Sequence, residues 1–430
     1  MAIEDDVLVV GGGLAGSIAA LSAAERDLRV RLVSNEGSTL RSASGLIDLL
    51  GYTPDGEGPI VEPFEHLTDL PAGHPYERVG RRAVREALSV FDAVVGDAYA
   101  GAHTDANALV PTAGGSIKPT ARYPASVAPG LASDPRDTLL VGFERLPGFD
   151  APLAAASLEA TGVPFRVRGV TVQFPGIECD DAAITRHARA LDLDERVEGV
   201  PVRAALAERV RPELNGAARV AFPALLGVDH DEVVRRDLAE RLGVAVFEIP
   251  GSPPSVPGIR LEERLRSALA HAGVRVTTGV RVVDYEGGRG DSRNAGRRIE
   301  RVLVERSGRR VPYRAEEYVL ATGGLVGGGI DSSRAGVREP IFGCHVPHPE
   351  DRYEWFADDP FGDHPFARFG LAVDRSLRPL TADGDPEFAN LRAAGAVLGG
   401  ADFAAEKSGS GISIATGYVA GSHAGREAAA

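Results

Sequence analysis

The chain has 430 residues, of which 43% are hydrophobic and 25% charged, and its formal net charge is −14. These proportions indicate an ordinary globular protein, long enough for two or three domains with buried cores. The acidic balance argues against a nucleic-acid-binding surface. No apolar run approaches the roughly 18 residues that cross a bilayer, so we expect a cytoplasmic protein without direct membrane insertion.

The sequence contains two cysteines, Cys179 and Cys344. Iron–sulfur and zinc sites need about four soft ligands, so this pair alone cannot form one. We therefore expect two unpaired thiols and no metal site. If the protein passes single electrons onward, another protein of the same complex must carry the clusters.

The first 33 residues are predicted to form a strand, a glycine-rich turn, a helix and a second strand. The turn matches the pattern G-x-G-x-x-G, in which Gly11 allows a tight turn and Gly13 lets the backbone approach a pyrophosphate. Gly16 lets the helix pack against the strand, and the helix N-terminus supplies N–H donors to the phosphate. The motif predicts a nucleotide cofactor that contacts Gly11, Gly13, Leu14, Ala15 and Gly16.

The end of the second strand departs from the usual pattern. An acidic residue there usually holds the ribose hydroxyls of an adenosine, but this chain has Ser34, with Glu36 two positions later. Either Glu36 substitutes for the acid, or the ligand has no adenosine half. The second alternative favours FMN over FAD, with Ser34 beside the cofactor.

A second α/β block follows, and after it the chain is predicted to return to the first domain. The block contains strands and helices at residues 138–141, 151–160, 165–172, 182–191, 202–210, 219–222, 231–242 and 244–247. The later elements are a helix, a strand, an antiparallel meander and a further strand, at residues 260–272, 274–276, 279–314 and 317–321.

Two late glycine segments are typical of flavoproteins. A turn with Thr322 and Gly323 ends the strand at 317–321, where it would lie over the flavin. Gly395 ends another strand, and Gly411 opens a final alanine-rich helix whose N-terminal dipole would stabilise negative charge on reduced flavin. Ala396 stands where an aspartate commonly holds the ribityl chain, which weakens the case for FAD further.

These elements predict an α/β protein. Its main part is a Rossmann-like flavin-binding domain of the two-dinucleotide-binding flavoprotein type, with an inserted α/β substrate or cap domain. We assign residues 1–50, 251–330 and 386–430 to the flavin-binding domain and residues 51–250 to the insertion. Residues 331–385 form a cap-side segment between parts of the flavin domain.

Motifs along nearly the whole chain carry a family resemblance. In order they are GGGLAG (11–16), SGLIDL (44–49), GHPY (73–76), PPSVPGIRL (253–261), GVREPI (336–341), FG (369–370), LRP (377–379) and GAVLGG (395–400). The chain resembles the B subunits of anaerobic glycerol-3-phosphate dehydrogenase. The resemblance implies an FMN-containing chain paired with an FAD-carrying partner subunit, and a membrane-attached iron–sulfur subunit that passes electrons to quinone. The implied reaction oxidises sn-glycerol 3-phosphate to dihydroxyacetone phosphate.

Such a reaction needs cations for the substrate phosphate and a base for its hydroxyl proton. We predict Arg338, Arg260 and His364 as catalytic residues, although any one arginine is more often a surface or ion-pair residue. Ser44 and Gly45 are expected beside the flavin, with a helix N-cap as the alternative.

Three functional hypotheses stay open. The chain is a catalytic flavin subunit, an electron-relay and scaffold subunit with substrate chemistry on its partner, or a stand-alone FAD-dependent dehydrogenase. The cofactor, FMN or FAD, discriminates between the first two and the third.

Overall fold

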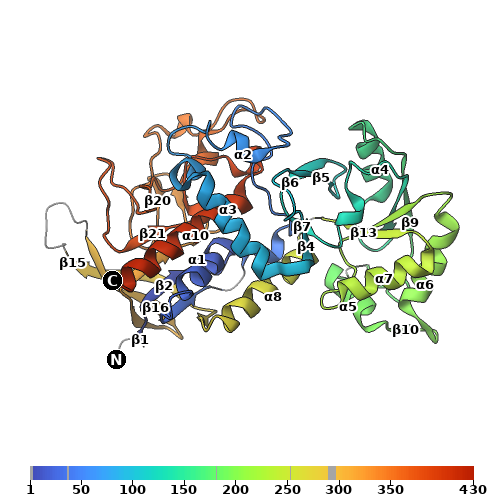
Figure 1. The fold of residues 1–430 in the computed structure, drawn as a ribbon, viewed down its shortest axis with the longest axis horizontal. Helices are drawn as coiled ribbons and strands as arrows, with labels where there is room; N and C mark the ends of the chain where they lie inside the picture. Colours follow the sequence, from blue (N-terminus) through green and yellow to red (C-terminus); the bar gives the residue numbers. More distant parts are fainter. Residues whose placement is uncertain (1–2, 36–37, 181, 252, 289–296) are drawn as a thin grey trace. The chain divides into compact units, whose positions relative to one another are not determined.

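A computed structural model describes residues 3–35, 38–180, 182–251, 253–288 and 297–430. The chain divides into two units. The first unit consists of residues 1–39, 48–94 and 264–430, and the second of residues 40–47 and 95–263. In Figure 1 the blue and the orange-to-red parts of the chain build the first unit.

This division differs from the expected domain boundaries. Residues 51–94, expected in the insertion, cluster with the first unit, and residues 251–263 cluster with the second. Residues 331–385 also belong to the first unit. Residues 51–94 include most of α3 (Pro75–Val95), a long helix that the sequence analysis did not predict and that bends at Gly80, where φ is 80°.

A parallel sheet of five strands forms the centre of the first unit. Its order is β14-β3-β2-β18-β21, and every neighbouring pair is parallel. The strands are β2 (Val7–Val10), β3 (Val30–Val33), β14 (Arg275–Thr277), β18 (Glu317–Leu320) and β21 (Leu391–Ala393). All of β2 and β18 is buried, as expected where helices or loops cover both faces of a sheet. The predicted strand–turn–helix–strand start of the chain is confirmed.

Two helices far apart in sequence, α1 (Leu14–Ala24) and α10 (Gly409–Ala428), pack side by side (Figure 1). Glycines of α10 face the backbone of α1: a Cβ at Gly417 would lie 2.5 Å from the carbonyl oxygen of Ala15. One turn later, a Cβ at Gly421 would lie 2.1 Å from the carbonyl oxygen of Ala19. The absence of side chains therefore sets how closely the two helices approach.

The predicted meander forms a second, smaller sheet of the first unit, in the order β1-β17-β16-β15. Its strands are β1 (Ile3–Glu4), β15 (Arg281–Gly288), β16 (Arg298–Arg306) and β17 (Arg309–Arg314). Other elements of this unit are α2 (Pro63–His66), β19 (Asp331–Ser333), β20 (Gly336–Arg338) and α9 (Phe403–Glu406).

The second unit contains the α/β block that the sequence predicted. Its main sheet is parallel, with the order β13-β12-β8-β9. The strands are β8 (Thr138–Phe143), β9 (Val167–Val172), β12 (Arg219–Pro223) and β13 (Ala245–Ile249). The helices are α4 (Ala151–Ala160), α5 (Ile184–Leu193), α6 (Val202–Val210), α7 (Asp231–Leu242) and the start of α8 (Val256–His271). Short strand pairs complete it: β4 (Tyr99–Ala100) with β7 (Tyr123–Pro124), β5 (Ala108–Pro111) with β6 (Ile117–Thr120), and β10 (Arg196–Val197) with β11 (Val200–Pro201).

The contact between α1 and α10 makes a direct prediction. In Gly421→Ala, the gain in helix propensity of about 1 kcal/mol is outweighed by the clash with Ala19, so we expect a net loss of about 2 kcal/mol or more. Gly425→Ala is the matched control, because its Cβ would lie 3.3 Å from Ala23 and the two effects nearly cancel. Urea unfolding of both variants measures the difference. Equal stabilities would contradict the proposed backbone contact.

Candidate functional site

Three glycine turns meet at one edge of the first unit's sheet. They follow β2, β18 and β21, and because these strands are parallel their carboxyl ends share that edge. A Cβ at Gly11 would lie 2.0 Å from the carbonyl oxygen of Ala321. A Cβ at Gly324 would lie 2.6 Å from the carbonyl oxygen of Ala396. The structure thus brings the early motif and both late glycine segments together.

The turn after β2 leaves an open place for a phosphate. Gly11 has a φ of 120°, and a Cβ at Gly16 would lie 1.9 Å from the carbonyl oxygen of Gly11, so both positions require glycine. Gly13 is the N-cap of α1 without a side-chain cap hydrogen bond, and a Cβ there would meet nothing within 4 Å. The first N–H groups of a helix, here those of Leu14 and Ala15 among them, have no partner inside the helix. They therefore fit an anion above Gly13.

The turn after β18 holds a buried polar atom that lacks a protein partner. Within the described parts of the chain, the buried Oγ1 of Thr322 has no hydrogen-bond partner. Leaving a buried hydroxyl unsatisfied costs about 1–3 kcal/mol. The next residue, Gly323, has a φ of 84°. A bound group with a hydrogen-bonding atom would complete this turn.

The turn after β21 leads to the N-terminus of α10. The N–H of Gly395 donates to Oγ1 of Thr416 (2.8 Å), and a Cβ at Gly395 would lie 2.7 Å from Cβ of Ala15. This contact places Gly395 directly beside the first turn of α1. The N-terminus of α10 is the positive end of its helix dipole. Its first turn contains no acidic residue that would offset this positive potential.

Gly411 has a different place from the one expected. Its N–H donates to the carbonyl oxygen of Asp48 (2.7 Å), and a Cβ there would lie 2.3 Å from the Tyr76 hydroxyl. Gly411 is therefore a packing residue that lets α10 start close to residues 48–49. Its expected contact with the flavin is not available through this N–H.

A buried polar cluster, which the sequence analysis missed, holds the segment before α10. Nε2 of His74 and Oε2 of Glu406 lie 3.1 Å apart, and the Ser408 hydroxyl donates to the same oxygen (2.9 Å). The backbone N–H of Tyr76 donates to Nδ1 of His74 (3.1 Å), so Nε2 carries the proton toward Glu406. Burial raises the pKa of Tyr76 well above its usual value, and its hydroxyl donates to the Leu49 carbonyl oxygen (2.7 Å). The motif GHPY was the only sequence signal for this cluster.

Comparison with known proteins identifies the family. The FAD binding domain family matches residues 6–412. A probable B subunit of anaerobic glycerol-3-phosphate dehydrogenase from Halobacterium salinarum is 58% identical, over 99% of this chain and 98% of the relative. The B subunit of anaerobic glycerol-3-phosphate dehydrogenase from Pectobacterium carotovorum is 31% identical, over 95% of this chain and 96% of the relative. The B subunit from Vibrio cholerae is 30% identical, over 96% of this chain and 95% of the relative. The chain belongs to this family of B subunits. The resemblance and the flavin-binding α/β fold are confirmed.

Ser34 lies beside the glycine turn, where the sequence placed it. A Cβ at Gly12 would lie 2.5 Å from Oγ of Ser34, and this hydroxyl donates to the carbonyl oxygen of Asn35 (2.9 Å). Glu36, the possible substitute for the usual acid, lies outside the described residues. The family description favours FAD, and Ser34 offers a hydroxyl rather than a carboxylate at this position.

Two of the predicted catalytic residues have partners of their own in the first unit. Arg338, on β20, forms an exposed ion pair with Asp331 of β19 at 2.9 Å. His364 is held within its loop: the N–H of Ala357 donates to its Nδ1, and its Nε2 lies 3.1 Å from the carbonyl oxygen of Pro360. Neither contact brings these side chains to the three glycine turns.

Arg260 requires a correction. It lies in the second unit, where its guanidinium pairs with the buried carboxylate of Glu248 (2.7 and 3.0 Å) and donates to the carbonyl oxygen of Gly227. A further contact to Asp231 at 3.5 Å completes its surroundings. Burial alone would lower the pKa of Arg260, but the Glu248 charge raises it. The guanidinium thus forms a buried ion pair within the second unit, and its charge is already balanced by protein carboxylates rather than by a substrate phosphate.

Ser44 and Gly45 belong to the second unit as well. The Tyr99 hydroxyl donates to the carbonyl oxygen of Gly45 (2.8 Å), and a Cβ at Gly45 would lie 2.7 Å from Cβ of Pro257. Ser44 accepts the N–H of Leu46 through its Oγ at 3.3 Å. Their contact with a flavin stays a prediction.

Neither a metal centre nor a membrane span is found in the part of the chain that the structure describes. No group of three or more His, Cys, Asp and Glu side chains there could hold a metal ion. No helix among these residues is long and apolar enough to cross a bilayer.

The Arg260–Glu248 pair predicts a pH dependence of stability. Burial favours the neutral acid, yet the Arg260 charge and the hydrogen bonds hold the pKa of Glu248 below its usual value. The pair therefore contributes fully above the unfolded value of about 4.3 and is lost as the pH falls from there toward the lower folded pKa. Glu248→Gln should cost about 3–5 kcal/mol at pH 7 and make the acid loss shallower, as measured by urea unfolding at pH 7 and at lower pH. The exposed Glu240→Gln is the control, and a variant as stable as the control would refute this account.

Proposed function

We propose that the protein is the flavoprotein subunit of a quinone-linked glycerol-3-phosphate dehydrogenase complex. The complex oxidises sn-glycerol 3-phosphate to dihydroxyacetone phosphate and passes the electrons through a partner iron–sulfur protein to quinone. The names of the relatives supply the substrate. The observation that carries the flavin role is the meeting of three glycine turns with the N-termini of α1 and α10 at one sheet edge.

The residues at this edge have distinct roles in the proposed site. The N–H groups after Gly13 hold a phosphate of the cofactor, and Oγ1 of Thr322, which has no partner among the described residues, bonds a polar atom of its flavin end. The N-terminus of α10 stabilises negative charge on the isoalloxazine ring, and the His74–Glu406 contact positions that helix start. When bound, the flavin supplies the acceptor for hydride from the substrate.

FAD is the cofactor that we propose, because the family is described as an FAD binding domain. FMN, which the sequence favoured, is the second candidate. The observation on its side is Ser34, whose hydroxyl is directed at the neighbouring Asn35 carbonyl oxygen and offers no carboxylate to a ribose.

A second function, electron relay with substrate chemistry on the partner, is supported by a different observation. The side chains predicted for substrate chemistry have internal partners: Arg338 pairs with Asp331, Arg260 with Glu248, and His364 bonds within its loop. In this version the chain holds the flavin and the partner holds glycerol 3-phosphate.

Gly13→Asp tests both versions. An Asp N-cap suits a helix start, so the fold should stand, while its carboxylate occupies and repels the phosphate position. We expect flavin per chain to fall by about tenfold or more, a loss of at least about 1.4 kcal/mol, with mass spectrometry identifying FAD in the wild-type extract. Gly114→Asp is the control, since a Cβ there also meets nothing within 4 Å.

The same variant separates the two functions in the assembled complex. If this chain's flavin receives the substrate hydride, Gly13→Asp abolishes glycerol-3-phosphate-dependent reduction of both an artificial dye and quinone. If the chain is a relay, dye reduction at the partner persists and only quinone reduction is lost. Wild-type protein that binds no flavin would refute both.

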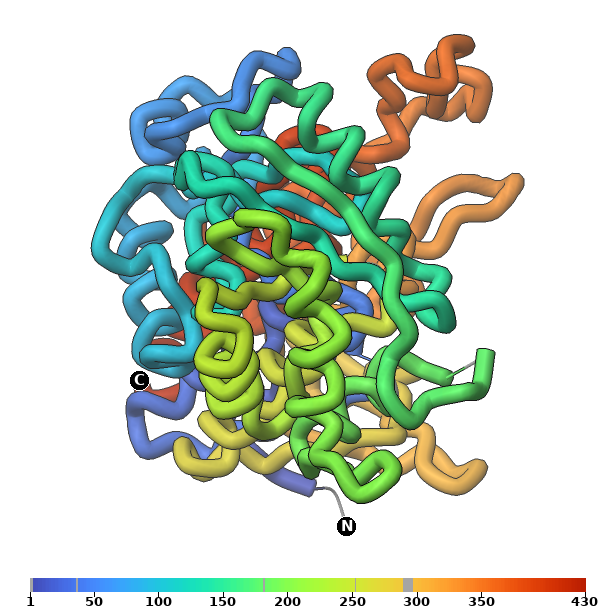
Figure 2. The backbone as a smooth tube through the Cα atoms, turned by 90° about the vertical axis from the view of Figure 1, so that its right-hand side faces the viewer, coloured from blue at the N-terminus to red at the C-terminus, as the bar shows by residue number. Residues whose placement is uncertain are grey.

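We also propose that the chain assembles with an FAD-carrying partner subunit and with the membrane-attached iron–sulfur subunit of the same complex. Support comes from exposed aromatic side chains in residues 350–366 of the first unit, the orange loop at the upper right of Figure 2. Phe361 is 98% exposed and Tyr353 76%. Large apolar groups at such exposure are typical of interfaces, and the acidic residues around them favour a partner with a basic rim.

The double variant Tyr353→Ser/Phe361→Ser should weaken assembly with the partner proteins by about tenfold or more. The cause is the loss of two aromatic anchors whose rings are largely exposed in the isolated chain. Co-purification yield and sedimentation measure assembly, with flavin content unchanged. Leu193→Ser, which removes a side chain that is 72% exposed in the second unit, is the control, and equal assembly of all three proteins would exclude this surface.

A further inference from the structure

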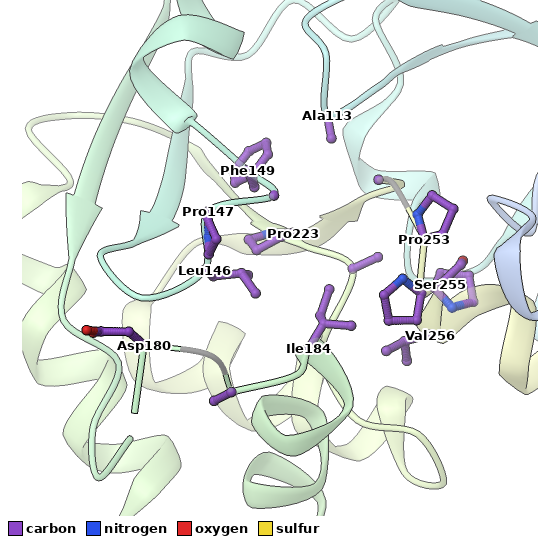
Figure 3. A pocket seen from close by; sticks show the side chains of 16 residues that line it. Ala113, Leu146, Pro147, Phe149, Asp180, Ile184, Pro223, Pro253, Ser255 and Val256 are labelled. Atoms are coloured by element: carbon purple, nitrogen blue, oxygen red, sulfur yellow. The ribbon is translucent and has the colours of Figure 1, made fainter. Parts of the chain in front are cut away.

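A cavity of about 230 Å³ lies within the second unit, at the carboxyl edge of its parallel sheet. Most of its lining residues lie at the ends of β8, β12 and β13 or in the segments that follow them (Figure 3). Leu146 and Gly148 follow β8, Pro223 ends β12 with Ala224 after it, and Pro253 follows β13. None of the proposed flavin contacts Gly11, Gly13, Thr322 or Gly395 lines it, so nothing in the proposed function accounts for it.

The cavity coincides with the point where the strand order reverses. From β8 the chain moves outward to β9, then returns to place β12 and β13 on the other side of β8. The helices divide accordingly: α4 packs on one face with Leu140 and Ala221, whereas α5, α6 and α7 pack on the other with Leu139 and Val220. In open α/β sheets, ligands bind in the crevice at such a switch point, here between β8 and β12.

The motif PPSVPGIRL, which the flavin role does not use, forms one wall of this cavity. Residues 253–257 all line it. A backbone hydrogen bond fixes this wall, because the N–H of Ser255 donates to the carbonyl oxygen of Arg41 (2.9 Å). Arg260, from the same motif, joins Glu248 of β13 to the Gly227 carbonyl oxygen. The buried ion pair thus fixes two of the segments around the cavity, which is what a preformed binding site requires.

The lining selects against charged ligands. None of the described residues that line the cavity is Lys, Arg or His, and the one carboxylate among them, Asp180, is 90% exposed and lies 3.4 Å from Arg145. A phosphate ester such as glycerol 3-phosphate would find no cation among these residues. The other lining groups are mainly apolar, with prolines on several walls. Ser255 accepts the N–H of Gly258 (3.1 Å), which leaves its hydroxyl proton to donate.

We propose that this cavity binds a small, uncharged ring compound whose apolar body fills the space between the proline walls and whose one acceptor atom bonds Ser255. The binding is independent of the flavin. It gives the second unit a ligand of its own.

The test uses the full chain and the neutral naphthalene ketone dye prodan. We expect a saturable blue shift of its emission with one site per chain. Gly148→Leu blocks the cavity at little structural cost, because a Cβ at Gly148 meets nothing within 4 Å. It should weaken binding by about tenfold or more. Gly114→Leu is the matched control: it is equally open and does not line the cavity.

The outcomes separate clearly. The proposal is supported if Gly148→Leu and a second blocking variant, Ala182→Leu, both lose the site. Both variants should keep the circular dichroism and flavin content of the wild type, and Gly114→Leu should bind the dye as the wild type does. Unsaturable binding, or equal binding by the blocked variants, overturns it, because the dye then sits on exposed aromatic surface elsewhere. Equal affinity for the sulfonated dye 1-anilinonaphthalene-8-sulfonate would contradict the claim that the cavity prefers uncharged ligands. Flavin content is measured in the same samples, so the proposed flavin role is tested separately from the proposed binding in the cavity.

Discussion

The close approach of bare backbone at the carboxyl edge of the first sheet is the constraint on which the candidate site depends. A Cβ at Gly16 would stand 1.9 Å from the Gly11 carbonyl oxygen, and one at Gly11 2.0 Å from that of Ala321. Nothing larger than hydrogen fits at either contact. Because three turns share this space, the N-terminus of α1, the Thr322 hydroxyl and Gly395 are delivered to one place by packing alone. The groups that these turns bring to the candidate site are peptide dipoles and one hydroxyl.

Local patterns predicted the βαβ start of the chain and the α/β block well, but they missed α3 and predicted long-range partners poorly. The helices at 151–160, 202–210 and 231–242 have the predicted bounds, since a run of helix-forming residues is a local signal. α8 begins at Val256, earlier than the predicted residue 260, because a proline is tolerated in the first helical turn. The glycine turns were found because the spacing of their glycines along the chain is itself what a phosphate-binding turn requires. The cluster of His74 and Glu406 was not, since its members lie 332 positions apart.

Arg260 shows why an arginine in a conspicuous motif is hard to interpret. The motif predicts importance, but whether the guanidinium meets substrate or a buried carboxylate depends on a strand, β13, that contributes Glu248 from outside the motif. An isolated buried guanidinium would be strongly unfavourable, and the pair is stabilised by charge together with hydrogen bonds from Ser126 and Leu226. The sequence contained both partners and no local sign that they meet.

The two units use the same geometry for opposite chemistry. Each has a parallel sheet, and in each the segments after the strands surround a candidate site at the carboxyl edge. In the first unit the glycine turn after β2 leads into α1, and a Cβ at its N-cap Gly13 would meet nothing within 4 Å, so the first N–H groups of α1 can reach an anion. In the second, prolines follow the strands, and proline has no N–H to offer. The helix after β8 is also capped by its own Asp150. Among the described residues, such an edge offers few donors beyond the Ser255 hydroxyl, so it suits an apolar, uncharged ligand. The difference between the two edges follows from the residue types after the strands rather than from the fold.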